Sequence, residues 1–169
     1  MDLPTFQFAA TPHIHFGVGQ RMSLIDIIGS YGSKVLLISG AQSFDNSPFC
    51  MALWDDLNHQ FEVKRERVSG EPSPAMVDGW VAQYQSFKPD VVLAIGGGSA
   101  VDAAKAVAGL LPSGDSVMEY LEGVGNSKTF AGITTPFVAV PTTAGTGGET
   151  SKNAVLSVIG EEGFKKSFR

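Results

Sequence analysis

Two glycine-rich loops hold the residues of this 169-residue chain whose types and spacing could do chemistry. The first, Gly96-Gly97-Gly98-Ser99, follows a short apolar run and precedes an alanine-rich stretch, a pattern typical of a buried strand that turns into a helix. Glycines let the backbone approach a ligand closely, and a helix N-terminus offers unpaired N–H groups and a positive dipole end. The loop therefore predicts a site for a phosphate or a similar anion.

Ser99 and Asp102 also have a purely structural interpretation. Ser99 is a good N-cap residue and Asp102 follows three residues later, so the pair predicts a variant capping box at the start of a helix. That interpretation accounts for both side chains. It accounts less easily for three consecutive glycines, because a strand-to-helix turn needs only one or two.

The second loop, Pro141 to Gly148, alternates hydroxyl side chains with glycines and also follows a short apolar run. Its candidate ligand-binding side chains are Thr142, Thr143 and Thr146. In open α/β sheets, ligands bind outside the carboxyl ends of the strands, so the two loops could hold one diphosphate between them. The alternative is an ordinary mobile surface connection.

The elements that must position these loops alternate between strand and helix. Apolar runs predict strands at 34–39, 90–95 and 136–140, and residues 61–68 are read as a further strand. Helical spacing predicts helices at 48–59, 76–84 and 101–111, with a short one near 117–121. This order predicts an α/β fold with a Rossmann-like, open, mostly parallel sheet and helices on both faces. We expect one domain over residues 1–169.

Composition excludes several classes of function. The net charge is −5, from 12 Lys and Arg against 17 Asp and Glu, without a basic block that would attract nucleic acid. No apolar run approaches the roughly 18 residues of a spanning helix, and the N-terminus lacks the pattern of a signal peptide. The single cysteine, Cys50, cannot form an intramolecular disulfide. We expect a soluble, cytoplasmic protein without a nucleic-acid or membrane partner.

Three segments together carry a specific resemblance. GGGSAVDAAKA at 96–106 resembles the GGGSxxDxAK signature of the iron-dependent (group III) alcohol dehydrogenases, and PTTAGTGGE at 141–149 is similar to their PTTAGTGSE segment. PHIHFGVG at 12–19 resembles the opening strand and turn of that family. The order and spacing agree as well, and the departure at Gly148, where the family usually has Ser, is small.

The resemblance implies a set of cofactor-binding residues. By that match Gly97, Gly98, Ser99 and Asp102 bind or frame a pyrophosphate, and the three threonines line the path toward a nicotinamide. Asn153, Val155 and Lys165 match later cofactor-contacting positions, whereas Lys105 is expected to be structural.

Gly40 is an informative departure within the resemblance. Members of the family that prefer NAD place an Asp at the end of the first strand, where its carboxylate accepts from the ribose hydroxyls and repels a 2′-phosphate. Here Gly40, with Gln42 and Ser43 close behind, leaves room and donors for that phosphate. We therefore expect a preference for NADP(H), with NAD(H) possible. In the alternative, Asp45 supplies the carboxylate or both cofactors bind.

The resemblance also implies a metal that this chain does not hold by itself. The divalent metal of the family, Fe²⁺ or another, is bound in a helical C-terminal domain, so the chain is expected to be the N-terminal half, able to bind the cofactor without turnover. The implied reaction interconverts small alcohols with aldehydes or ketones by metal-assisted hydride transfer, in a homo-oligomer such as a dimer. His13 and His15 are expected on the opening strand as packing or solvated residues.

Two other functions remain open from the sequence. Dehydroquinate synthase resembles the same architecture, although the PTTAGTG loop favours a dehydrogenase. A non-catalytic nucleotide-binding module is the third possibility, and it would lack the large exposed apolar patch of a domain separated from its partner.

Overall fold

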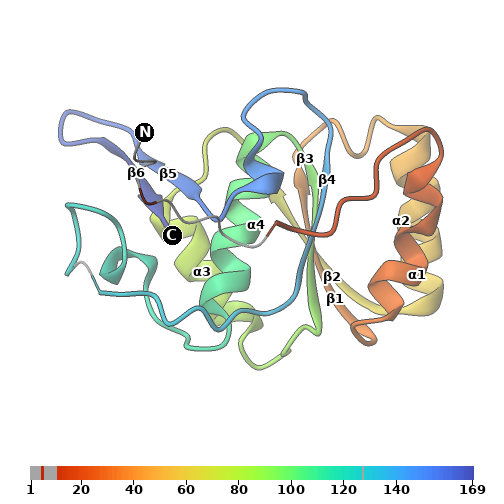
Figure 1. Cartoon of the computed structure of the whole chain (residues 1–169), viewed down its shortest axis with the longest axis horizontal. Coiled ribbons are helices and arrows are strands. Elements are labelled where there is room, and N and C mark those ends of the chain that lie inside the picture. Colours follow the sequence, from red (N-terminus) through yellow and green to blue (C-terminus); the bar gives the residue numbers. More distant parts are fainter. Residues whose placement is uncertain (1–4, 6–10, 127) are drawn as a thin grey trace.

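A parallel sheet of four strands forms the centre of the computed structural model, which describes residue 5 and residues 11–126 and 128–169 (Figure 1). The strands are β1 (Lys34–Gly40), β2 (Glu62–Val68), β3 (Val91–Gly96) and β4 (Phe137–Pro141), in the order β2-β1-β3-β4. Buried β-branched and leucine side chains on both faces of β1 and β3 explain why these runs read as continuously apolar. The four predicted strands are confirmed, and each end lies within one residue of its predicted position.

Helices cover both faces of this sheet (Figure 1). The short helix η1 (Gln20–Ser23), α1 (Leu24–Gly29) and α2 (Pro48–Gln60) lie on one side, where α1 and α2 pack against the sheet. On the other side α3 (Pro74–Tyr84) and α4 (Gly98–Leu110) pack on the alternate side chains of the same strands. The predicted α/β fold with helices on both faces is thus confirmed. The helix pair at 20–29 had no counterpart in the sequence-based prediction.

Serine–proline pairs start two of the helices. Ser47 accepts a hydrogen bond from the amide of Cys50, and Ser73 accepts one from the amide of Met76, while Pro48 and Pro74 occupy the first helical position. Proline fits there because its missing N–H would have no intrahelical partner. These caps fix where the chain leaves β1 and β2 and turns back along the sheet.

The predicted opening strand is absent. Residues 11–16 have no regular structure, and His13 and His15 are exposed. An extended segment becomes a strand only by hydrogen bonding to a neighbour, and no strand in the described part of the chain pairs with this one.

A C-terminal hairpin was not predicted. Strands β5 (Ala154–Val158) and β6 (Phe164–Phe168) pair antiparallel and pack on the outer side of α4. Gly109 permits this contact, because a Cβ atom there would lie 2.9 Å from the ring of Phe168. The hairpin extends the layer of α3 and α4 away from the sheet.

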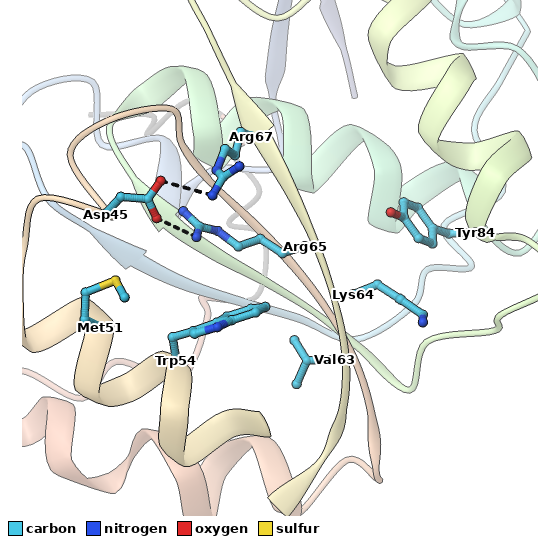
Figure 2. Close-up of a pocket in the computed structure, with 8 residues that line it drawn as sticks. All are labelled: Asp45, Met51, Trp54, Val63, Lys64, Arg65, Arg67 and Tyr84. Carbon is cyan, nitrogen blue, oxygen red and sulfur yellow. Dashed lines mark hydrogen bonds and ion pairs between the residues drawn. The ribbon is translucent and has the colours of Figure 1, made fainter. Parts of the chain in front are cut away.

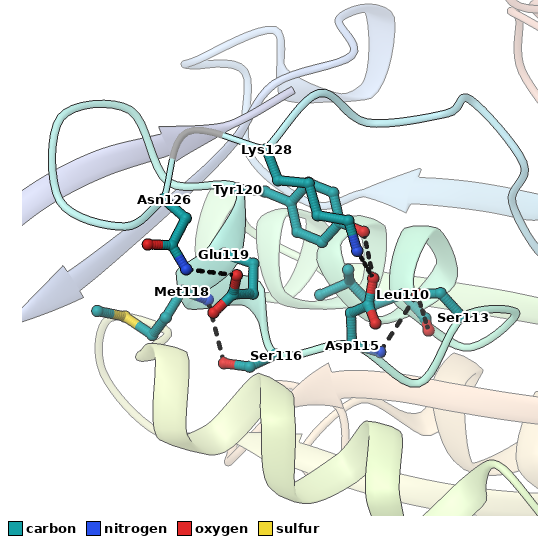
Figure 3. A network of polar contacts seen from close by, with 9 residues as sticks. All are labelled: Leu110, Ser113, Asp115, Ser116, Met118, Glu119, Tyr120, Asn126 and Lys128. Atoms are coloured by element: carbon teal, nitrogen blue, oxygen red, sulfur yellow. Dashed lines mark hydrogen bonds and ion pairs between the residues drawn. The ribbon is translucent and has the colours of Figure 1, made fainter.

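The segment between α4 and β4 is held by side-chain hydrogen bonds (Figure 3). It contains the short helix η2 (Val117–Glu119). Asp115 accepts from the hydroxyl of Tyr120 and pairs with Lys128 at 2.6 Å, and the carboxylate of Asp78 in α3 accepts from the amide of Val117 at 2.7 Å. The bond to Asp78 fastens the segment to α3, and the contacts of Asp115 hold the segment itself together.

Across the described residues, no helix is both long enough and apolar enough to cross a membrane.

The core makes a simple prediction about stability. Ile38 in β1 is fully buried, whereas Ile133 is 70% exposed. Ile38→Ala should lower the free energy of unfolding by about 2–5 kcal/mol, because it removes buried methyl groups and leaves a cavity. Ile133→Ala makes the same chemical change at the surface and should stay within about 0.5 kcal/mol. Urea denaturation of both variants tests the difference, and equal effects would contradict the assigned core.

Candidate functional site

The strand order creates a crevice at the carboxyl edge of the sheet. After β1 the chain continues into α2 on one face, and after β3 it continues into α4 on the other. Neighbouring parallel strands whose connections leave in opposite directions form the switch point at which ligands bind in open α/β sheets. A pocket of about 220 Å³ opens there, with Ser43, Ser47 and Cys50 from the chain after β1, Ile95 from β3 and Thr142 from the chain after β4 among its lining residues.

The three glycines at the end of β3 have different roles. Gly96 has φ 158°, and a Cβ atom there would lie 2.8 Å from the Cβ of Ala100, so the backbone itself requires glycine. Gly97 has φ −77° and ψ −173°, values open to any residue, and a Cβ there would make only ordinary contacts at 3.5 Å with Thr143. Neither backbone conformation nor crowding requires glycine at this position, which is the N-cap of α4, where glycine is one of the favoured residues.

The predicted capping of α4 is wrong. The helix starts at Gly98, and Gly97 is the N-cap residue, without a side-chain hydrogen bond. Ser99 therefore lies inside the first turn, and the capping box of Ser99 with Asp102 does not form. The start moves because the carbonyl of Gly97 already accepts from the amides of Ala100 and Val101. First-turn amides that no side chain caps suit an anionic ligand.

The loop at residues 141–148, called the threonine loop below, lies directly against the glycine loop at residues 96–99. The amide of Thr142 donates to the carbonyl of Gly96 at 2.9 Å. Thr143 is the nearest neighbour of Gly97, and Thr146 lies 3.3 Å from where a Cβ of Gly98 would be. The structure thus brings together five of the predicted residues: Gly97, Gly98, Thr142, Thr143 and Thr146.

The end of β1 borders the same crevice. A Cβ atom on Gly96 would lie 3.3 Å from the amide nitrogen of Gly40, and one on Gly40 would lie 2.8 Å from the hydroxyl oxygen of Ser43. Gly40 and Ser43 are therefore adjacent, next to the glycine loop. The side chain of Gln42 is exposed on the connection toward α2.

Lys105 and Asp102 connect α4 to the chain that follows the threonine loop. The ammonium of Lys105 donates to the carbonyls of Gly148 and Asn153, the latter at 2.6 Å, and lies 4.0 Å from Asp102. Burial lowers the pKa of Lys105 and raises the pKa of Asp102, and the positive charge of Lys105 opposes the latter shift. Lys105 thus holds the loop on α4, as its structural interpretation predicted, and Asp102, Asn153 and Val155 lie beside it.

Lys165 is engaged elsewhere. On β6 its ammonium pairs with Glu71 at 2.8 Å, and Glu71 also accepts from the hydroxyl of Ser157 on β5. The hydrogen bond from Lys165 holds the pKa of Glu71 below its ordinary value. The positive charge of Lys165 also reaches Asp102, where it opposes the effect of burial on the pKa. Lys165 therefore faces the turn before α3 and lies within electrostatic range of α4.

Sequence reasoning missed a charged cluster beside Gly40. Arg65 and Arg67 on β2 both pair with Asp45, at 2.7 and 3.1 Å, and Figure 2 shows the two guanidinium groups pointing toward its carboxylate. The hydrogen bond from Arg65 is the main reason that the pKa of Asp45 lies below its ordinary value. The cluster borders a hollow of about 450 Å³ at the edge of the sheet. The spacing Arg-x-Arg on a strand next to β1 was the available signal, because alternate residues share a face.

No described residues form a metal site. Among them, no group of three or more His, Cys, Asp and Glu side chains could hold a metal ion. Asp55 and His59 in α2 do have the spacing Asp-x-x-x-His, but Nδ1 of His59 lies 2.6 Å from the carbonyl oxygen of Asp55, so the ring is engaged with the backbone of its own helix.

Comparison with known proteins agrees with this geometry. The sequence model of the family described as iron-containing alcohol dehydrogenase matches residues 11–169. An alcohol dehydrogenase of Thermococcus barophilus is 30% identical over 156 residues, which are 88% of this chain and 40% of that protein. A 4-hydroxybutyrate dehydrogenase of Cupriavidus necator is 35% identical over 103 residues, which are 61% of this chain and 26% of that protein.

A solved structure extends the likeness to the whole fold. The sulfoacetaldehyde reductase from Bifidobacterium kashiwanohense, crystallised in complex with NAD⁺, superposes with a TM-score of 0.82 at 28% identity, covering 98% of this chain and 43% of that one. This chain thus spans less than half the length of each of these relatives. The family match covers both glycine-rich loops, and we conclude that the chain belongs to the iron-containing alcohol dehydrogenase family.

Proposed function

We propose that this chain is the dinucleotide-binding domain of an oxidoreductase that interconverts small alcohols with aldehydes or ketones, and that it prefers NADP(H) to NAD(H). One observation carries the proposal: at the β1/β3 switch point, the first turn of α4 has no side-chain cap and lies against Thr143 and Thr146 of the facing loop. The ligand that such a site accommodates is a diphosphate resting on the first turn of a helix.

The pyrophosphate would rest on the first turn of α4. The amides of Gly98 and Ser99 and the positive end of the helix dipole supply its attraction. Thr142, Thr143 and Thr146 offer hydroxyl donors from the facing loop, which the bond between Thr142 and Gly96 holds in place. Asp102, Asn153 and Val155 lie next along α4 and β5, and we propose that they border the nicotinamide half together with Lys165.

The preference for NADP(H) rests on the end of β1. Gly40 presents no carboxylate to accept from the ribose hydroxyls, and Ser43 offers a hydroxyl beside it. A carboxylate at this position would repel a 2′-phosphate, so its absence favours the phosphorylated cofactor. Asp45, the alternative source of a carboxylate, is paired with Arg65 and Arg67.

For the substrate and the metal, the proposal extends only to their chemical class. When bound, the nicotinamide accepts or supplies a hydride, and the residues of this chain hold and orient it. The chain spans less than half the length of the relatives named above, and we propose that the metal and most of the substrate pocket belong to the part of such proteins that it does not match. By their names, the relatives act on 4-hydroxybutyrate, on an alcohol and on sulfoacetaldehyde, and we propose small alcohols and aldehydes or ketones as the substrate class here.

The family match favours this function over the two alternatives. It supports a dehydrogenase over a dehydroquinate synthase. Exposed apolar side chains on the segment before α1, including Ile14, Phe16 and Val18, are unusual for a free-standing module. We propose that this segment is covered in the complete protein, which we expect to be a homo-oligomer such as a dimer.

Calorimetric titration with NADPH and NADH tests the cofactor assignment. The chain should bind NADPH more tightly. Gly40→Asp should lower the affinity for NADPH by about tenfold or more, because the new carboxylate repels the 2′-phosphate. A tenfold change in affinity requires only about 1.4 kcal/mol of binding free energy. Gly79→Asp, at an open position in α3, is the matched control and should change neither affinity. Equal binding of the two cofactors by the unmodified chain would contradict the preference.

Gly97→Ala tests the glycine loop itself. The added methyl group fits the folded chain, so thermal stability should be nearly unchanged, but it would occupy the space proposed for the pyrophosphate. Affinity for both cofactors should therefore fall by about tenfold or more, as expected when a close backbone–phosphate approach is blocked. Gly79→Ala, in open space on α3 and outside both loops, serves as the control and should leave both affinities unchanged. Undiminished binding by Gly97→Ala would rule out this placement of the pyrophosphate.

A further inference from the structure

Two arginines and one carboxylate form a charged cluster at the carboxyl edge of the sheet. Arg65 is only 9% exposed, and its guanidinium donates to the hydroxyl of Ser39 at 3.0 Å and to Asp45 at 2.7 Å. Its remaining terminal nitrogen, Nη2, is buried and has no hydrogen-bond partner among the described residues. Arg67 is 58% exposed and reaches the second oxygen of Asp45. The site therefore has more donors than the carboxylate of Asp45 can satisfy.

The strand register puts this cluster beside the end of β1. Arg67 is the partner of Ser39, and Val68 is the partner of Gly40, in the parallel pairing of β1 with β2. The amide of Ala41 also donates to the carbonyl of Val68 at 3.0 Å, so pairing continues past Gly40. Arg65 and Arg67 thus lie on the strand next to the position at which we place the adenine ribose, on the same face as Ser39.

We propose that Arg65 and Arg67 bind the 2′-phosphate of NADP(H), and that the phosphate takes the place which Asp45 occupies in this structure. The inference rests on the proposed function, because it assumes that the adenine ribose lies at the end of β1. It assigns the specificity to two residues outside the segments that carry the family resemblance.

The charges of the cluster favour a phosphate over a carboxylate. Two guanidinium groups carry two positive charges, and Asp45 neutralises one of them. A phosphate monoester at neutral pH carries between one and two negative charges and three terminal oxygens, so it matches both arginines and offers an additional acceptor for Nη2 of Arg65. Arginine is suited to this task because its planar, permanently charged fork binds phosphate oxygens in pairs.

Asp45 is placed to be exchanged. It lies in the turn-rich connection between β1 and α2 and is itself exposed, whereas Arg65 is fixed by Ser39 and by the faces of Phe44 and Trp54. The arginines therefore keep their positions when the carboxylate moves away. Until the cofactor arrives, Asp45 stabilises two neighbouring positive charges that would otherwise repel each other.

A competing role for Asp45 predicts different measurements. If the carboxylate of Asp45 instead accepted hydrogen bonds from the ribose hydroxyls, it would favour binding of NADH, and removing the carboxylate would lower the affinity for NADH. If the carboxylate only occupies the phosphate position, removing it should raise the affinity for NADPH and leave the affinity for NADH unchanged. Replacement of Asp45 thus separates the two roles by the cofactor that responds and by the sign of the response.

The experiment titrates the chain and three variants with NADPH and with NADH by calorimetry at one low salt concentration. Arg67→Gln should lower the affinity for NADPH by about tenfold, which corresponds to the loss of roughly one charge-assisted contact. Its affinity for NADH should stay within about twofold of that of the unmodified chain. Asp45→Asn should raise the affinity for NADPH severalfold and leave the affinity for NADH unchanged. Arg169→Gln is the control, because Arg169 is similarly exposed at 50% and pairs with Glu122.

The outcomes separate this inference from the function on which it rests. Arg67→Gln with an undiminished preference for NADPH would overturn the inference and leave the proposed function intact, and so would loss of NADH binding in Asp45→Asn. An unmodified chain that binds neither cofactor, or binds both equally, would overturn the two together. Arg67 and Asp45 are exposed, so both variants should fold, and an unchanged melting temperature checks this.

Discussion

The direct pairing of β1 with β3 is the constraint on which the rest of the structure depends. Because these strands are hydrogen-bonded neighbours although β2 lies between them in sequence, the chain must leave them toward opposite faces of the sheet. The connection after β1 and the glycine loop after β3 therefore diverge and leave a crevice between them. Gly40 and Gly96 lie in contact at its base. The apolar side chains of both strands make this pairing stable, so the core and the candidate site share one origin.

Polar contacts then fix the loops around that crevice. The amide of Thr142 holds the threonine loop to the end of β3, and Lys105 holds the following segment to α4 through two backbone carbonyls. On the other side, Asp45 joins the connection after β1 to the arginines of β2. Loops held in this way lose little conformational freedom on binding, which is a general condition for tight recognition. We infer that the pyrophosphate part of the site is largely formed before a cofactor arrives, whereas the contact of Asp45 with the arginines is the one that the proposed 2′-phosphate would replace.

Local pattern decides how much of this could be read from the sequence. Strands β1 and β3 were predictable because each is a buried apolar run, β4 because it is a short apolar run, and α2 and α3 because apolar residues recur at helical spacing. The start of α4 was missed because Ser99 suggested a cap, whereas the carbonyl of Gly97 starts the helix earlier. The C-terminal hairpin depends on docking of Phe168 against Gly109, and the arginine cluster on the register of β2 beside β1. The spacing Arg-x-Arg is visible in the sequence, but the pairing that puts it beside the end of β1, like the docking of Phe168, is a long-range contact that local pattern does not show.

The central claim is that a dinucleotide binds at the crevice between β1 and β3. Amide chemical shifts of the ¹⁵N-labelled chain, followed during titration with NADPH, test this claim most directly. The account predicts that the largest changes occur at Gly97, Gly98 and Ser99 and at the end of β1, with little change in the β5–β6 turn at residues 159–163. Changes concentrated away from the carboxyl edge of the sheet, or no changes at saturating NADPH, would contradict it.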